Sequence, residues 1–222
     1  MEINGTIGTE RSPNREGTGS ILAEKAAATD GARERLLKAA TEVFNRKGYA
    51  AASVSEIVAD AGVTKPVLYY YFANKEGIYR EIMETAFALF DEVLDRDYAH
   101  CPTVREKITA LFDDVVDLFR RHLPVVRLFH AIYYGPPQGV PFIDFHAKHI
   151  KWNRVILDRV EEGVRRGEFL PLDPLDMTQA LMAAVIYRLD LLLCPEIENY
   201  PMPDHRRLLD IVFRGILPPG RV

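Results

Sequence analysis

Residues 63–75 read VTKPVLYYYFANK, and this stretch decides how the first part of the chain folds. Thr64 is a suitable cap for a short helix, and Pro66 falls in its first turn, where a missing amide proton costs little. Three tyrosines in a row then follow, although one face of a helix buries only about two of four adjacent side chains. The sequence therefore predicts that some of these rings are exposed and have a function.

A second short helix precedes this one. Ser53 and Glu56 have the spacing of a capping box, which predicts a helix over about residues 53–61. Gly62 can adopt the positive φ of a tight turn, and two short helices joined in this way form a helix-turn-helix. A first helix over about residues 31–48, with apolar residues at helical spacing, completes the predicted domain.

The helix-turn-helix indicates DNA as a partner. Its second helix enters the major groove with its N-terminal residues nearest the bases, which here begin with Thr64 and Lys65. Tyrosine hydroxyls suit the phosphate walls of the groove, and Lys75 at the next helix N-terminus would favour an anion. The alternative is that the tyrosines are core residues with wet hydroxyls, and Tyr71 fits that description best.

Charge and composition agree with this interpretation. The net charge is −4, but residues 31–80 carry eight Lys and Arg against five Asp and Glu, a local net charge of +3. Two cysteines, Cys101 and Cys194, provide no disulfide framework and suit a reducing compartment. The first twenty residues lack the apolar core of a secretory signal, and charges interrupt the apolar run at residues 181–193. We therefore expect a cytoplasmic protein without a membrane segment.

Helical periodicity continues from Asp30 almost to the end of the chain, which predicts an all-α fold of about nine helices. Residues 1–29 are rich in small polar and charged residues and are predicted to form a flexible N-terminal tail. Residues 30–76 would form the helix-turn-helix DNA-binding domain. Residues 77–222 would form a larger helical domain.

Residues 31–82 resemble the DNA-binding domain of the TetR family of bacterial transcriptional regulators. The resemblance is carried by RERLLKAATEVFNRKGY, SVSEIVADAGV and TKPVLYYYFANKEGIY. It implies that Lys65, Pro66 and Val67 approach the bases, and the apolar Val67, where many relatives have a small polar residue, suggests contact with a thymine methyl group. It also implies contacts with the DNA backbone, or positions close to it, for Ser53, Ser55, Thr64, Tyr69, Tyr70, Tyr71 and Lys75.

The resemblance further implies that the larger domain binds a small-molecule effector and forms a homodimer. Aromatic and histidine residues interleave there in a way that suits a ligand pocket, although aromatic residues at helical spacing are also typical of a plain core. The candidate effector-binding residues are Phe87, Phe90, Phe112, Phe119, Phe129, Tyr133, Phe145, His146, Trp152 and Tyr187.

The last two predicted helices, over about residues 174–193 and 204–217, are so apolar that each needs cover on several sides. Packing against the same helices of a second copy would supply it, and burial within one chain is the alternative. The candidate dimer-interface residues are Leu181, Val185, Leu189, Leu208, Val212 and Ile216.

No enzyme motif, cofactor motif or metal-ligand cluster is evident. His146 and His149 share a helix face, but they have no companion ligands at metal-binding spacing. The sequence thus predicts a homodimeric regulator, a repressor by family analogy, that binds a palindromic double-stranded DNA operator. A small, largely apolar effector would release it. The alternatives are an effector-independent DNA-binding protein, and an all-α small-molecule carrier or enzyme.

Overall fold

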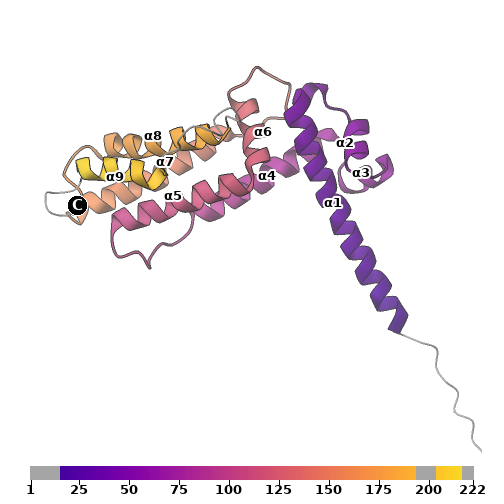
Figure 1. Ribbon diagram of the computed structural model, residues 1–222, viewed down its shortest axis with the longest axis horizontal. Helices are drawn as coiled ribbons and strands as arrows, with labels where there is room; N and C mark the ends of the chain where they lie inside the picture. Colours follow the sequence, from indigo (N-terminus) through magenta and orange to yellow (C-terminus); the bar gives the residue numbers. More distant parts are fainter. Residues whose placement is uncertain (1–15, 194–203, 217–222) are drawn as a thin grey trace, which may run out of the picture.

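The structure is a computed structural model that describes residues 16–193 and 204–216, with side chains from Gly31 onward. The described residues form nine helices and no strand, so the all-α prediction is confirmed (Figure 1). The helices are α1 (Glu16–Ala51), α2 (Val54–Asp60), α3 (Lys65–Tyr71), α4 (Lys75–Leu94), α5 (Val104–Arg121), α6 (Leu123–Tyr133), α7 (Phe145–Arg165), α8 (Pro174–Leu193) and α9 (His205–Ile216). No helix in these ranges is long and apolar enough to cross a membrane.

Helix α1 differs from the prediction at its beginning. It starts at Glu16, so residues 16–29, which the sequence assigns to a flexible tail, continue the helix; residues 1–15 lie outside the described residues. Figure 1 shows this first half of α1 extending away from the other helices. Near the other end, Gly48 leaves helical geometry with φ 78° and ψ 159°, a conformation open essentially to glycine alone.

The helix-turn-helix forms as local sequence rules predict. Ser53 Oγ accepts from the Glu56 amide while the Glu56 carboxylate accepts from the Ser53 amide, so the predicted capping box is present. Gly62 takes a φ of 63° in the turn between α2 and α3. Leu68 and Phe72 then reach a buried cluster with Phe44 of α1 and Ile57 of α2. This cluster fixes α3 against α1 and α2.

Two apolar clusters divide the molecule, and α4 belongs to both. Ile78 and Tyr79 near its beginning join the cluster of the helix-turn-helix, whereas Val93 and Leu94 near its end join the core of the larger helical bundle. The predicted boundary between residues 76 and 77 stays a prediction. The packing makes α4 an element shared by the two parts.

Helix α6 lies between α1 and the bundle of α5, α7, α8 and α9 (Figure 1). Its Leu128 is buried in the cluster of the helix-turn-helix. Two hydrogen bonds reinforce the junction: Asn45 Nδ2 donates to the Pro124 carbonyl at 2.8 Å, and the Tyr49 amide donates to Gln138 Oε1 at 2.8 Å. Movement of α6 or of the loop that follows it would therefore displace α1.

Candidate DNA-binding surface and effector cavity

The N-terminal half of α3 presents the predicted base-reading residues. Lys65 and Pro66 are exposed and Val67 is half-buried. Thr64 holds the N-cap position with an extended backbone, as predicted, although its side chain makes no capping hydrogen bond. Its exposed hydroxyl is therefore not committed to the helix, in keeping with the predicted contact to a DNA backbone.

The three tyrosines divide as the helix geometry requires. Tyr69 is 53% exposed and Tyr70 is 77% exposed, so neither ring serves as a core residue. Tyr71 is half-buried, packs against the cluster of the helix-turn-helix and meets Tyr70 edge-to-face at 4.9 Å between ring centroids. The core explanation thus applies in part to Tyr71 and fails for the other two.

Lys75 has a structural role that the sequence analysis missed. Its Nζ donates to the carbonyls of Tyr49 at 2.8 Å, Ala50 at 3.4 Å and Ala52 at 3.0 Å, and lies 4.4 Å from the Tyr49 ring centroid. An ammonium group has three N–H donors, and these three carbonyls use them. The predicted phosphate contact of the Lys75 ammonium therefore requires some of these bonds to be exchanged.

At the start of α2, Ser53 and Ser55 are both exposed, as a position beside DNA requires. The Ser53 hydroxyl also donates to the Glu56 carboxylate at 2.9 Å. Glu56 in turn pairs with Lys47, and hydrogen bonds from Lys47 and Ser53 lower the pKa of its carboxyl to about 2. The Glu56 carboxylate thus offsets the Lys47 charge on this surface.

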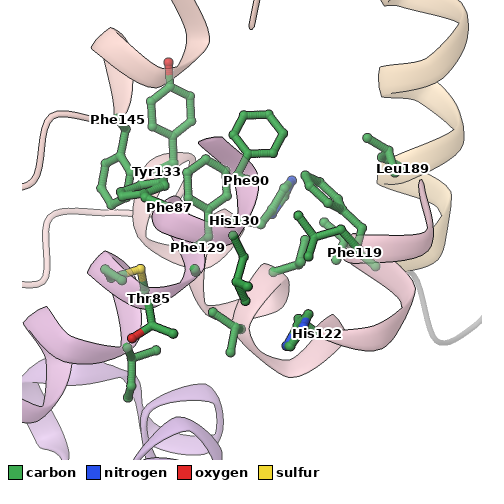
Figure 2. Close-up of a pocket in the computed structure, with 18 of the residues that line it drawn as sticks. Thr85, Phe87, Phe90, Phe119, His122, Phe129, His130, Tyr133, Phe145 and Leu189 are labelled. Atoms are coloured by element: carbon green, nitrogen blue, oxygen red, sulfur yellow. The ribbon is translucent and has the colours of Figure 1, made fainter. Parts of the chain in front are cut away.

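An apolar cavity of about 370 Å³ lies between α1, α4, α5, α6, α7 and α8. Figure 2 shows Phe87, Tyr133 and Phe145 grouped on one side of it, with Phe119 and Leu189 on the other. Phe129 stacks on Tyr133 at 5.7 Å and meets Phe145 edge-to-face at 5.1 Å. The volume and the aromatic walls are typical of a small-molecule site.

Seven of the ten predicted effector-binding residues line this cavity: Phe87, Phe90, Phe119, Phe129, Tyr133, Phe145 and Trp152. The other three do not. Phe112 is fully buried in the core of the bundle, His146 is exposed, and Tyr187 is exposed on α8. Helix face alone does not explain this, because Phe112 shares a face of α5 with Phe119, and His146 shares a face of α7 with His149. Phe119 and His149 line the cavity, so position along the helix decides.

Several lining residues were not predicted. The α6 wall adds Val125, Val126 and His130, which lie three or four residues from Phe129 or Tyr133 and could have been found from helical spacing. Leu37 and Thr41 of α1 also line the cavity, and nothing in their local sequence signals it. The cavity therefore reaches the first helix of the DNA-binding part.

The cavity wall carries few ionisable groups. Besides histidines and tyrosines, they are Lys38 on α1 and Asp190 on α8. Desolvation raises the pKa of the Asp190 carboxyl above its ordinary value, and the nearby His130 opposes that shift. One residue of each sign leaves the lining without a strong preference for a charged ligand.

The predicted dimer interface needs correction. Leu181, Val185, Leu189 and Ile216 are buried in the core of their own chain, so they are not available to a partner, and Leu189 lines the cavity. Leu208 and Val212 are half-buried and stay candidates. The exposed face of these helices carries other apolar residues: Leu175, Ala180, Ala183 and Tyr187 on α8, and Ile211 on α9.

Comparisons with known proteins identify the helix-turn-helix part. The family model described as bacterial regulatory proteins, tetR family, matches residues 36–82. An uncharacterized HTH-type transcriptional regulator, YdgC of Bacillus subtilis, is 51% identical over 51 residues, which are 23% of this chain and 26% of YdgC. The HTH-type transcriptional regulator QacR of Staphylococcus aureus is 33% identical over 75 residues, 34% of this chain and 40% of QacR. The matches thus span a quarter to two fifths of these relatives.

Solved structures match over most of the chain. The TetR-family protein CprB of Streptomyces coelicolor A3(2) superposes with a TM-score of 0.62 at 25% identity, covering 87% of this chain and 92% of CprB. A gamma-butyrolactone receptor described as ArpA-like gives a TM-score of 0.58 at 26% identity, covering 86% of this chain and 90% of the receptor. The two-part helical architecture is therefore shared with these proteins.

Proposed function

We propose that this chain is a transcriptional regulator of the TetR family that binds a near-palindromic DNA operator as a homodimer and is released by a small effector. Repression is the proposed sign of regulation, in keeping with a negative transcriptional regulator, IcaR of Staphylococcus epidermidis, among its relatives. As part of this proposal, it acts in the cytoplasm, where the operator is found. The two bound reading helices would occupy successive major grooves, about 34–36 Å apart.

One observation carries the proposal: α1 is shared by the DNA-binding part and the cavity. Leu36, Val43 and Phe44 on one face are buried beneath α2 and α3. Leu37 and Thr41 on another face lie in the cavity wall. A ligand that favours one position of α1 would change the position of α3, and so weaken DNA binding through its differential affinity for the two states.

The homodimer is proposed on the exposed apolar face of α8 and α9. Ile211 is 68% exposed, and the small Ala180 and Ala183 allow close approach of a partner helix. A two-fold axis through this face would pair the same helices of two chains in an isologous interface. Such a dimer would also match the two-fold symmetry of a palindromic operator.

The effector is proposed to be small and largely apolar, because the cavity has about 370 Å³ and mainly aromatic and aliphatic walls. The presence of a gamma-butyrolactone receptor among structures of the same fold supports an effector of that size. An effector-independent DNA-binding protein would have no use for such a cavity. A carrier or enzyme would have no use for the exposed Tyr69 and Tyr70.

Selection of bound sequences from a random double-stranded DNA pool, at physiological salt, tests the DNA-binding part of the proposal. We expect enrichment of one inverted repeat. A Lys65→Glu variant, which reverses the charge at an exposed position of α3, is the matched control and should enrich nothing. A folded protein that enriches no sequence, or enriches single half-sites only, would contradict the proposed dimeric regulator.

A further inference from the structure

Gln138 lies in the loop between α6 and α7, and its side-chain amide bridges two helices. Its Oε1 accepts from the Tyr49 amide near the end of α1 at 2.8 Å, and its Nε2 donates to the Ala131 carbonyl in the last turn of α6 at 3.4 Å. Figure 1 shows this loop beside that end of α1. Because α1 belongs to the DNA-binding part and the loop leads into α7 of the bundle, one side chain connects the two parts of the molecule.

The Tyr49 amide depends on this acceptor. Gly48 has φ 78° and ψ 159°, so the backbone leaves the helical hydrogen-bond pattern directly before Tyr49. Tyr49 is only 7% exposed, and a buried amide without an acceptor is costly. A Cβ at Gly48 would lie 2.8 Å from Gln138 Oε1, so the side chain fits closely against the backbone of α1. The contact therefore specifies one arrangement of the loop and α1.

Apolar contacts hold the same loop on the DNA-binding part. Val140 and Ile143, on the C-terminal side of Gln138, are partly buried against the cluster of the helix-turn-helix. Apolar contacts are not directional, so they tolerate small sliding movements, whereas a hydrogen bond depends on both distance and angle. The bond between Gln138 and Tyr49 thus fixes an orientation that the apolar contacts leave adjustable.

From Tyr49 the connection continues towards the reading helix. The Tyr49 carbonyl accepts from Lys75 Nζ at 2.8 Å, and Lys75 begins α4, the helix that follows α3. One residue of α1 therefore links the loop to the segment that carries α3. The other hydrogen bond of the junction, from Asn45 to the Pro124 carbonyl, is exposed and joins α1 to the beginning of α6.

We propose that Gln138 is a positioning residue that sets the orientation of the DNA-binding part on the bundle, and so selects the spacing of the two half-sites in the operator. This inference rests on the proposed function, because spacing has a meaning only for a dimer on an inverted repeat. Insertion of one base pair moves a half-site by about 3.4 Å along the DNA and turns it by roughly 35°. A DNA-binding part held by Gln138 follows that displacement only when the bond to Tyr49 breaks.

Operators of altered spacing test the proposal. The inverted repeat selected by the wild-type protein is prepared with its own spacing, with one base pair inserted or deleted at its centre, and as a single half-site. Fluorescence anisotropy measures the affinity of wild type and Gln138→Ala for each DNA. The insertion and the deletion should weaken binding about tenfold less in Gln138→Ala than in wild type, the effect of one buried hydrogen bond that no longer has to break. Affinity for the single half-site should stay unchanged, because Gln138 lies outside the helix-turn-helix.

Two further variants separate positioning from general destabilisation. Gln138→Glu keeps an oxygen that accepts from the Tyr49 amide and should retain the wild-type spacing preference. Glu168→Ala is the matched control, because Glu168 Oε2 accepts from the Val104 amide at 2.7 Å within the bundle, and its loss should not alter the spacing preference.

An equal spacing preference in wild type and Gln138→Ala would overturn the proposal. An equal relaxation in Glu168→Ala, or a loss of half-site affinity in Gln138→Ala as large as its loss on the full operator, would overturn it as well. Selection of no inverted repeat by the wild-type protein would overturn the proposed function and this inference with it, so the two failures are distinguishable.

Discussion

At the scale of single residues, the tyrosines and lysines around α3 have different tasks. Tyr69 and Tyr70 are exposed to solvent, whereas Tyr71 packs against the core. Lys75 donates hydrogen bonds to the backbone between α1 and α2 and so stabilises that segment. Lys65 is exposed at the beginning of the reading helix. These placements agree with the proposed DNA contacts of Lys65, Tyr69 and Tyr70, and they give Lys75 a structural task.

Tyr69→Phe should weaken operator binding by a few-fold to about tenfold, equally for all sequences, because it removes one hydrogen bond to phosphate. Lys65→Ala should in addition change which bases are preferred. Fluorescence anisotropy with the selected operator and with single-base variants measures both effects. Tyr134→Phe, at an exposed tyrosine of the larger part, is the control. An unchanged affinity for Tyr69→Phe would refute the phosphate contact.

Lys75→Met should lower the free energy of unfolding by roughly 1.5–3 kcal/mol, the range for a lost hydrogen bond to a charged group. The physical reason is that three backbone carbonyls lose their donor while the aliphatic stem is kept. Urea denaturation measures the change, and Lys65→Met at an exposed site should be nearly neutral. If Lys75→Met were fully stable but defective in operator binding, the phosphate contact would be its main role.

At the scale of elements, the loop between α6 and α7 is attached to the end of α1. Gln138 Oε1 accepts from the Tyr49 amide, directly after the non-helical Gly48. A Cβ at Gly48 would lie 2.8 Å from the same Oε1 atom. Glycine is therefore needed at this position for two reasons: the backbone angles are accessible essentially only to glycine, and the Gln138 side chain leaves no room for a Cβ atom.

Gly48→Ala should destabilise the protein by about 1–3 kcal/mol, part of it from strain and part from displacement of Gln138. In a Gln138→Ala background the cost should fall by about 1 kcal/mol, since the hydrogen bond is already absent. Gly62→Ala is the control: its φ is also positive, but no atom lies within 4 Å of the added Cβ, so its cost should be the same in both backgrounds. Urea denaturation of the four single and double variants, with wild type and Gln138→Ala as references, decides whether the two positions are coupled.

At the scale of the whole molecule, the core of the bundle is complete within one chain, yet α8 and α9 keep an apolar outer face. The inner residues Leu181, Val185 and Ile216 are buried, while Tyr187 and Ile211 are exposed. A dimer would therefore cover the outer face of α8 and α9 without disturbing the core that their inner faces form within one chain. The two reading heads would then be connected through α8 and α9, the cavity, and α1.

Ile211→Asp should convert the dimer to a monomer, because it places a charge in the centre of the proposed apolar interface. Analytical ultracentrifugation measures the mass, and operator affinity should fall with it. Phe142→Asp is the matched control, since Phe142 is 82% exposed in the loop before α7, away from this face. A variant that stays dimeric would place the interface elsewhere.

The sequence by itself determined the helix-turn-helix. The Ser53–Glu56 capping box and the turn with a positive φ at Gly62 both form among residues close in sequence. Such interactions depend little on the rest of the fold, so a local pattern predicts them. The division of the tyrosines follows from helical period for the same reason.

The tertiary structure alone decided which faces of the later helices meet which neighbours. Phe112 and Phe119 have the same chemistry and lie on one helix, yet the first is core and the second lines the cavity. Likewise, the sequence predicts Leu181 and Val185 at a dimer interface, but the structure buries them within one chain, where α8 packs against α5, α7 and α9. Gln138 meets Tyr49 across 89 residues of chain. Contacts of this kind depend on how elements far apart in sequence pack together. Hydrophobic periodicity predicts which face of a helix is apolar, but not which other element packs against that face.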